Sequence, residues 1–161
     1  MSKFNQRVRP VSREIIKEYK TPWTVDQVAR RVVANSSGLA HLIKEATWSA
    51  PQWGMPELIL EHVKQVVRKE LQRSKRITFT DGTKQDVRLY ESFNFSGGRA
   101  HKWQMMARVT LTQLQMKMDW RLGHIAANQV VIGAEAAIIK EMLAKGLETV
   151  GQAVPELLEV H

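Results

Sequence analysis

Residues 77–89 read ITFTDGTKQDVRL, and this stretch gives the clearest prediction of local structure in the chain. Apolar and polar side chains alternate on both sides of Asp81 and Gly82, which is the pattern of two half-buried strands joined by a tight turn. A two-residue loop would place the two apolar sets on opposite faces, whereas a three-residue loop over residues 80–82 places them on one face. Because burial sets the register, we expect the three-residue loop, with a type I turn, a left-handed Gly82 and a bulge. The shared face then holds Ile77, Phe79, Val87 and Leu89.

Upstream of this hairpin, capping signals predict a series of helices. Thr24 and Gln27 have the spacing of a capping box, in which the hydroxyl and the amide each satisfy a backbone N–H at the start of a helix. Apolar residues then recur at helical spacing until the sequence Asn-Ser-Ser-Gly at 35–38. A further helix is expected over residues 12–20, with Ser12 as its cap and its end before Pro22.

Two more helices are expected between residue 39 and the hairpin. A short one begins at Leu39 and ends near residue 47. A longer one covers residues 57–74, because Pro56 suits the first position of a helix and apolar residues share one face. The other face of this helix is basic, and its cations gather near the C-terminal end, where the helix dipole favours them.

The C-terminal part of the chain is expected to be one long apolar helix. Residues 92–100 read as a loop, and residues 101–109 fit a strand or a helix equally well. Capping-box spacing between Thr110 and Gln113 then predicts a helix start at Leu111. Apolar residues recur in steps of four and three until glycine and proline end the pattern at Gly146, Gly151 and Pro155, which indicates a heptad-like seam. The seam residues are Met118, Leu122, Ile125, Gln129, Ile132, Ala136, Ile139 and Leu143.

A helix this apolar is buried on most sides, either inside its own chain or in a homodimer. Gln129 at a seam position is suggestive of a partner, since a buried polar residue can fix the register or the oligomeric state. Burial within the same chain is the simpler interpretation for a single domain. The seam remains the best candidate for a homodimer interface.

Length and composition indicate a globular protein. The chain has 161 residues, of which 43% are hydrophobic and 25% charged, so it can bury a core without disulfides. We expect a single domain over residues 1–161; two lobes, residues 1–75 and 76–161, are the alternative. The expected fold class is mainly α (α+β), a helical domain with one two-stranded β-hairpin and a long C-terminal helix.

The absence of cysteine excludes disulfides, thiolate nucleophiles and cysteine-based zinc sites, and it is easiest to reconcile with a cytoplasmic location. The basic N-terminus is not followed by the apolar run of a secretory signal. The longest apolar stretch, residues 125–139, contains Asn128, Gln129 and Glu135 and is too short to span a bilayer. We therefore expect no association with a membrane.

Positive charge is concentrated in the first half of the chain. The formal net charge is +8. Residues 1–76 hold 15 Lys/Arg against 7 Asp/Glu, residues 77–121 hold 7 against 4, and residues 122–161 hold 2 against 5. A basic front with an acidic tail indicates that any attraction to a polyanion belongs to the front. A generally basic protein whose charge serves solubility is the alternative.

Residues 25–45 are a candidate helix-turn-helix, in which two short helices pack at a steep angle and the second enters the major groove. The packing positions are filled by Val28, Ala29, Val32, Ala34, Leu39 and Leu42. Val33 counts against the match, since glycine commonly opens the turn at that place. An ordinary helical hairpin, whose apolar residues are only core, is the alternative. The residues expected to contact DNA are Ser36, Ser37, His41 and Lys44, with Arg30 and Arg31 on phosphates.

Two further groups of cations are candidates for binding phosphate. One lies at and after the end of the helix over 57–74, where Lys and Arg would neutralise phosphates and release counterions; compensation of the helix dipole alone would also explain it. Its members are Arg68, Lys69, Arg73, Lys75 and Arg76. The other is the glycine-containing loop 96–103, where Arg99 and Lys102 would complete an anion site and Trp103 would stack on a base. An ordinary connecting loop is the alternative there.

No pattern for catalysis or for a cofactor is present. The histidines have no His-x-x-x-His spacing and no carboxylate partner at ligand spacing, so no metal site is expected. The Gly-x-Ser-x-Gly elbow and the Walker phosphate loop are also missing. An enzyme site built from dispersed residues stays open as a third hypothesis, without support from a motif.

The sequence thus favours a non-enzymatic nucleic-acid-binding protein, DNA-binding rather than RNA-binding and regulatory, that uses the basic helical surface of residues 24–76. The alternative from a different class is a protein-interaction module, such as an inhibitor or an assembly component, that docks on an acidic protein surface.

Overall fold

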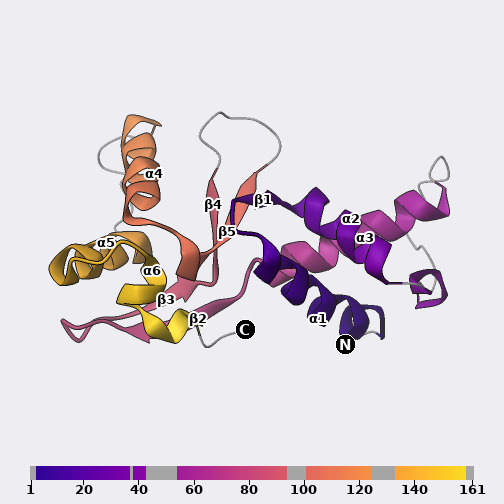
Figure 1. The fold of residues 1–161 in the computed structure, drawn as a ribbon, viewed down its shortest axis with the longest axis horizontal. Coiled ribbons are helices and arrows are strands. Elements are labelled where there is room, and N and C mark those ends of the chain that lie inside the picture. The colour runs from indigo at the N-terminus through magenta and orange to yellow at the C-terminus, as the bar shows by residue number, and fades with distance from the viewer. Residues whose placement is uncertain (1–2, 37, 43–53, 94–100, 125–132, 159–161) are drawn as a thin grey trace. The chain divides into compact units, whose positions relative to one another are not determined.

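A computed structural model describes residues 3–36, 38–42, 54–93, 101–124 and 133–158 of the chain (Figure 1). These residues form an α+β protein of helices and small antiparallel strand pairs. The chain divides into two compact units, Met1–Leu71 and Gln72–His161. Whether the chain is one domain or two lobes stays a prediction.

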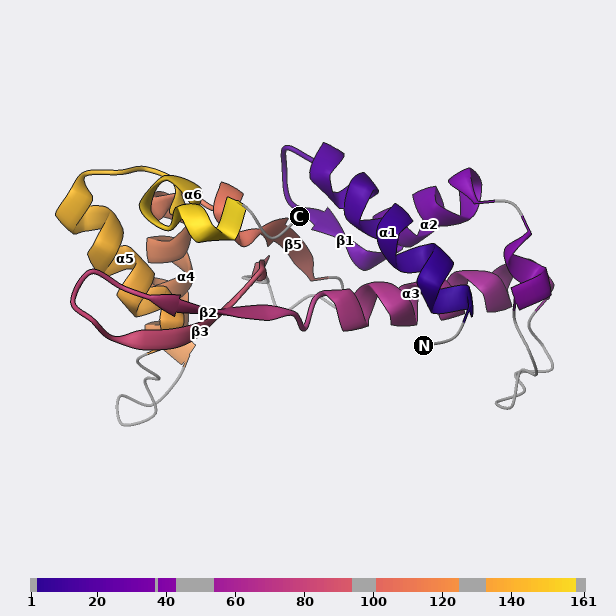
Figure 2. The ribbon, with the colours of Figure 1, turned by 90° about the horizontal axis from the view of Figure 1, so that it is seen from below.

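The first unit is helical. Its elements are α1 (Lys3–Glu18), the short extended segment β1 (Trp23–Thr24), α2 (Val25–Asn35), a 3₁₀ turn over Leu39–Leu42, and α3 (Met55–Glu70). Both α1 and α2 pack against α3 (Figure 2). The core of the unit consists of apolar side chains from these three helices, namely Phe4, Val8, Ile15, Ile16, Val28, Ala29, Val32, Val63, Val66 and Val67.

The start of α1 differs from the prediction. The helix begins at Lys3, not at Ser12, and it passes through Pro10 even though proline disfavours a helix interior. Ser12 is not a cap: its Oγ donates a hydrogen bond to the Val8 carbonyl oxygen at 2.8 Å from the middle of the helix. The reason is burial at helical spacing, which outweighs one lost backbone hydrogen bond. The buried face holds Phe4, Val8, Ser12, Ile15 and Ile16.

The predicted start of α2 is confirmed. The Gln27 N–H donates to Thr24 Oγ1 at 3.1 Å, and the Thr24 N–H donates to Gln27 Oε1 at 2.8 Å, which is the full capping box. The helix ends at Asn35, at the predicted Asn-Ser-Ser-Gly break. In α3, Pro56 lies in the first turn as expected, but the helix ends at Glu70, four residues before the predicted end. Ser74 instead begins a strand.

The hairpin opens the second unit and has the predicted register. Strand β2 (Ser74–Thr78) pairs antiparallel with β3 (Lys84–Arg88). The Phe79 N–H donates to the Thr83 carbonyl at 2.8 Å, and Gly82, at φ 85°, donates to the Phe79 carbonyl at 2.9 Å. The four apolar side chains are buried on one face, as predicted: Ile77, Phe79, Val87 and Leu89.

A second strand pair was not predicted. Strand β4 (Tyr90–Phe93) pairs antiparallel with β5 (Lys102–Met105), so the expected loop over 92–100 is wrong for Ser92 and Phe93, while residues 94–100 lie outside the described residues. The ambiguous stretch 101–109 contains β5 and then a 3₁₀ turn over Met106–Arg108. The pattern of β4 is misleading because Tyr90, Glu91 and Phe93 are all buried, so no alternation of polar and apolar residues marks the strand.

The single long C-terminal helix is wrong. The capping box at Thr110 is confirmed, and α4 spans Leu111–His124. Gly133, however, has an extended backbone and is the N-cap of a separate helix, α5 (Ala134–Lys145). That helix ends as expected at Gly146, which is left-handed at φ 66°. Glycine inside a helix is unfavourable, and Gly133 is one of two glycines in the predicted seam region.

The seam residues do not form one face of one helix. Met118, on α4, and Ile139, on α5, are half-buried, and Leu143 is 59% exposed. Ile125, Gln129 and Ile132 lie outside the described residues, and the side chain of Leu122 is likewise not described. The homodimer that the seam was expected to form therefore stays a prediction.

Gly151, in the short helix α6 (Val150–Ala153), gives a direct test of packing in the second unit. A Cβ at this position would lie 2.8 Å from the Ala107 carbonyl oxygen and 3.0 Å from a methyl carbon of Leu158. Because the carbonyl belongs to the backbone, no side-chain rotation relieves the overlap. We expect Gly151→Ala to lower the free energy of unfolding by about 1–3 kcal/mol in urea denaturation.

Glu156→Ala is the matched control for this substitution, because Glu156 is exposed and lies close in sequence. Its free energy of unfolding should stay within about 0.5 kcal/mol of the wild type. A Gly151→Ala protein as stable as the wild type would contradict the close approach of α6 to Ala107.

Candidate nucleic-acid interface

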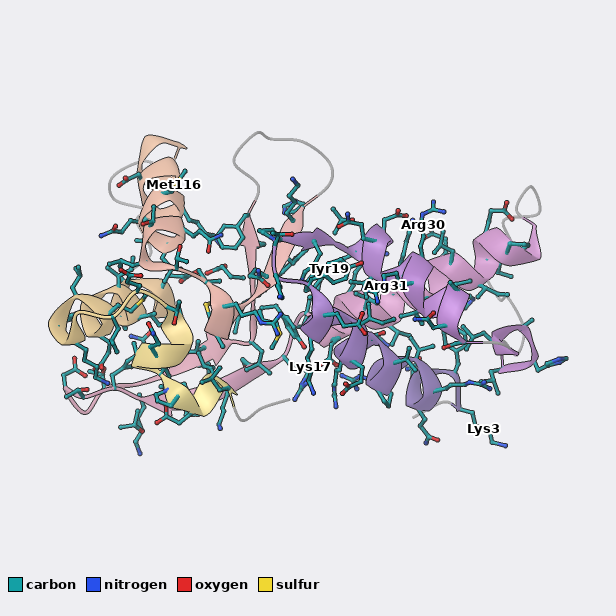
Figure 3. All side chains as sticks on the ribbon, viewed as in Figure 1. Lys3, Lys17, Tyr19, Arg30, Arg31 and Met116 are labelled. Atoms are coloured by element: carbon teal, nitrogen blue, oxygen red, sulfur yellow. The ribbon has the colours of Figure 1, made fainter. Side chains whose placement is uncertain are left out.

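The two arginines of the candidate helix-turn-helix are held in ion pairs. Arg30 Nε lies 2.8 Å from Asp26 Oδ2, one turn earlier on α2. Arg31 pairs with Glu18 and lies over the Tyr19 ring, with its guanidinium carbon 5.2 Å from the ring centroid (Figure 3). A phosphate would have to compete with these carboxylates for both guanidinium groups.

The hydrogen bonds within these ion pairs shift the pKa values of their members. The hydrogen bond from Arg30 lowers the pKa of Asp26, which burial by itself would raise. The hydrogen bond to Glu18 raises the pKa of Arg31. Both shifts mean that the charged forms are the stable ones, so the pairs persist at neutral pH.

Only some of the other residues of the predicted helix-turn-helix are described in the structure. Of the packing residues, Val28, Ala29, Val32 and Leu39 are buried, whereas Ala34 is exposed. Ser36, expected to face DNA, is 8% exposed, and His41 is exposed. At the expected start of the second helix, the described residues form a 3₁₀ turn over Leu39–Leu42, and Ser37 and Lys44 lie outside the described residues. The motif stays a prediction.

The last turn of α3 separates its charges by face. Arg68 and Lys69 are exposed, whereas the neighbouring Glu70 is completely buried. Glu70 Oε1 lies 2.9 Å from Arg13 Nε, and its Oε2 lies 3.5 Å from Arg9 Nε, so two arginines of α1 neutralise it. Among the described residues, Arg68 and Lys69 have no carboxylate partner and remain available to an anion.

The predicted basic edge is divided between the two units, and its grouping stays a prediction. Arg68 and Lys69 belong to the first unit, while Arg73, Lys75 and Arg76 belong to the second. Within β2, Lys75 and Arg76 point to opposite faces, because side chains alternate along a strand. Lys75 is half-buried, and its Nζ donates to the Glu156 carbonyl at 3.3 Å, whereas Arg76 is exposed.

Arg76 belongs to a basic solvent face of the hairpin, which was not among the predicted sites. Strands β2 and β3 lie side by side (Figure 2), and their register pairs Ser74 with Arg88, Arg76 with Asp86, and Thr78 with Lys84. All six residues are exposed. We call this set the ribbon face. Arg76 Nη1 lies 3.4 Å from Asp86 Oδ1, in an exposed pair of the kind that contributes little to stability. The alternation that predicted the buried face could also have placed Lys84 and Arg88 together on the other.

The turn of the hairpin is fixed to α5. The Thr80 N–H and hydroxyl donate to the two carboxylate oxygens of Glu141 at 2.6 and 2.9 Å. Lys145 Nζ lies 3.1 Å from the same carboxylate. Burial would raise the pKa of Glu141, but the hydrogen bonds from Thr80 and Lys145 outweigh burial and hold the pKa below its usual value. The turn therefore stays anchored at neutral pH.

The third predicted group is described only in part. Arg99 lies outside the described residues, Lys102 is exposed on β5, and Trp103 is half-buried. The expected anion site at this loop stays a prediction. The residues that the structure describes contain no group of three or more histidine and carboxylate side chains able to hold a metal ion. Within the same residues, no helix is both long and apolar enough to cross a membrane.

Comparison with known proteins adds no family assignment. No protein-family model matches the chain, and no curated protein or solved structure matches it either.

Proposed function

We propose that this chain is a non-enzymatic regulatory protein that binds nucleic acid, DNA rather than RNA, through exposed cations of its basic surface. The observation that carries the proposal is a set of exposed cations that no carboxylate of the described residues neutralises. Each such cation can neutralise a phosphate and release a condensed counterion, which is the main source of sequence-independent affinity for nucleic acid. The set includes Arg68 and Lys69 on α3 and Lys84 and Arg88 on β3.

The paired cations provide the contrast that makes the proposal testable. Lys17 pairs with Glu14 at 3.1 Å, and Lys64 lies 3.2 Å from Asp26 and 3.3 Å from Glu61. Replacing these lysines lowers the net charge as much as replacing Arg68 and Lys69, but it takes away cations that carboxylates already neutralise. A response to net charge alone would be the same for both replacements.

We expect Arg68→Gln/Lys69→Gln to weaken binding to every DNA sequence alike and to reduce the salt slope of the association constant by about 2. The measurement is fluorescence anisotropy of a labelled duplex at several salt concentrations. Lys17→Gln/Lys64→Gln, with the same change in net charge, should leave the slope nearly unchanged.

Equal losses in the two double variants would contradict the proposal, because they would show that net charge and not the exposed positions determines binding. Absence of binding to duplex DNA, single strands and RNA near physiological salt would also overturn it. An acidic protein surface would then be the partner that the positive charge favours.

A further inference from the structure

We infer that the β2–β3 ribbon enters the major groove of duplex DNA with its ribbon face toward the base edges. The inference rests on the proposed function and adds to it the class of ligand and the groove that is read. The B-form major groove is about 12 Å wide and admits a two-stranded β-ribbon, whereas the minor groove is about half as wide. The hairpin has the required form, with two five-residue strands in unbroken register.

The ribbon face consists entirely of side chains that can hydrogen-bond to base edges. Arg76 and Arg88 carry the fork of donors that binds the O6 and N7 atoms of guanine, and Lys84 can donate to the same atoms. Ser74 and Thr78 can bond to any base, and Asp86 can accept from the cytosine amino group. No apolar side chain interrupts this face, since the apolar residues of both strands are on the other side.

The spacing of these side chains suits stacked base pairs. Alternate residues of one strand stand roughly 6.8 Å apart, which is more than the axial rise of about 3.4 Å between successive base pairs. Ser74, Arg76 and Thr78 can therefore face different base pairs along the groove. Their cross-strand partners lie about 4.8 Å to the side, so both strands of the ribbon fit within the groove.

The ribbon is held in place before any ligand arrives. Ile77 and Val87 are 2% and 0% exposed on the inner face, and the turn is bound to Glu141 of α5. Little conformational freedom is lost when such an element binds, so more of the interaction energy appears as affinity.

The same chemistry disfavours double-stranded RNA. The major groove of A-form RNA is deep and narrow, and side chains cannot read it. Recognition of phosphates alone would not discriminate in this way, because both duplexes present phosphates along both strands. Preference for a DNA duplex over an RNA duplex of the same sequence is therefore the first expected result.

The decisive probe is a duplex in which 7-deazapurines replace guanine and adenine, because this change removes only the N7 acceptors of the major groove. The starting duplex is the tightest binder selected by the wild-type protein from a random-sequence pool. We expect the 7-deaza duplex to bind about fivefold or more weakly. Arg68→Gln/Lys69→Gln should retain the same ratio, since its missing cations are assigned to phosphates.

Arg76→Lys/Arg88→Lys separates reading of bases from charge. The variant keeps both charges but loses the bidentate fork, so the ratio of its affinities for the two duplexes should be clearly smaller than that of the wild type, while the salt slope is kept. Some discrimination should remain, because lysine can still donate to N7. Because both positions are exposed, the fold should be unaffected, which circular dichroism would check.

Three results would overturn the inference. They are equal affinity for the normal and 7-deaza duplexes, equal affinity for DNA and RNA duplexes, and an unchanged ratio in Arg76→Lys/Arg88→Lys. In each of these cases the protein still binds nucleic acid, so binding through exposed cations stands, although equal affinity for the two kinds of duplex would also remove the proposed preference for DNA. Failure of the wild type to bind any nucleic acid would overturn both.

Discussion

Replacing Lys117 with methionine is expected to lower the free energy of unfolding by about 3–5 kcal/mol, because it leaves a buried carboxylate without its counter-charge. Lys117 on α4 pairs with Glu91 on β4, and the two side chains are 8% and 4% exposed. The Lys117 ammonium also lies 5.8 Å from the centroid of the Phe93 ring. Among the described residues, Glu91 Oε2 is buried without a hydrogen-bond partner, so Lys117 is the main compensation for this charge.

The double variant Lys117→Met/Glu91→Met is the control. Apolar residues of similar volume in place of a buried ion pair are often neutral or stabilising, so the second substitution should restore most of the loss. Urea denaturation of the wild type and of the variants gives the three free energies. A double variant as unstable as Lys117→Met would show that the two side chains are not energetically coupled.

The same pair predicts a pH dependence for Lys117→Met. Burial raises the pKa of Glu91 above its ordinary value of 4.5, and Lys117 opposes that rise. Without the lysine the folded-state pKa rises further, so the folded protein binds a proton that the unfolded chain has released. The stability of the variant should therefore fall, relative to that of the wild type, as the pH rises above 4.5, and it should recover on acidification.

The second large loss of stability is expected in the first unit. Its size should depend on whether the carboxylate or the guanidinium groups of the ion-pair cluster are removed. Glu70 is completely buried, whereas the side chains of Arg9 and Arg13 are 26% and 35% exposed. Arg9→Met/Arg13→Met leaves the buried carboxylate without either guanidinium and should cost about 3–5 kcal/mol of stability. Glu70→Met leaves two cations that can turn toward water, so its loss should be the smaller one.

Denaturation of the triple variant Arg9→Met/Arg13→Met/Glu70→Met completes this comparison. We expect it to be more stable than Arg9→Met/Arg13→Met, because the buried carboxylate that has lost both guanidinium groups is gone. If Glu70→Met proved the more damaging change, burial of the carboxylate would not be what sets the energy of this cluster.

The predictions from sequence were correct for features that depend on residues close together in the chain. The capping boxes at Thr24 and Thr110 are satisfied by residues three positions away, and both were predicted. The register of the hairpin followed from burial of Ile77 and Val87 on one face.

Other elements depended on contacts that no local pattern encodes. Pro10 and Ser12 look like a boundary, yet burial of the whole α1 face continues the helix through them. Strands β4 and β5 are short. In each residue pair between them, at least one residue is buried or half-buried, and exposed and buried residues do not alternate along either strand. The prediction of one long helix was wrong because it extended the regular apolar spacing through Gly133. Glycine has a low helix propensity, which already disfavoured a continuous helix there.

In the candidate site, too, contacts between residues close in sequence were predictable, whereas contacts between separate elements were not. The pair of Arg30 with Asp26 has the i,i+4 spacing that a helix brings together, so it could have been read from the sequence. The pair of Arg31 with Glu18 joins two helices and could not. Separation of Arg68 and Lys69 from the buried Glu70 likewise depends on how α1 packs against α3. The ribbon face could have been predicted from the sequence, because the alternation of side chains along a strand alone places Lys84 and Arg88 on the same face.

The central claim is that exposed cations of this chain neutralise phosphates of DNA. The most direct test is the association constant of the wild-type protein for a duplex, measured at several salt concentrations. With four or more phosphates neutralised, the logarithm of the constant should fall linearly with the logarithm of the salt concentration, with a slope of about −3.6 or steeper. A slope near zero, or no binding at about 150 mM salt, would contradict the claim.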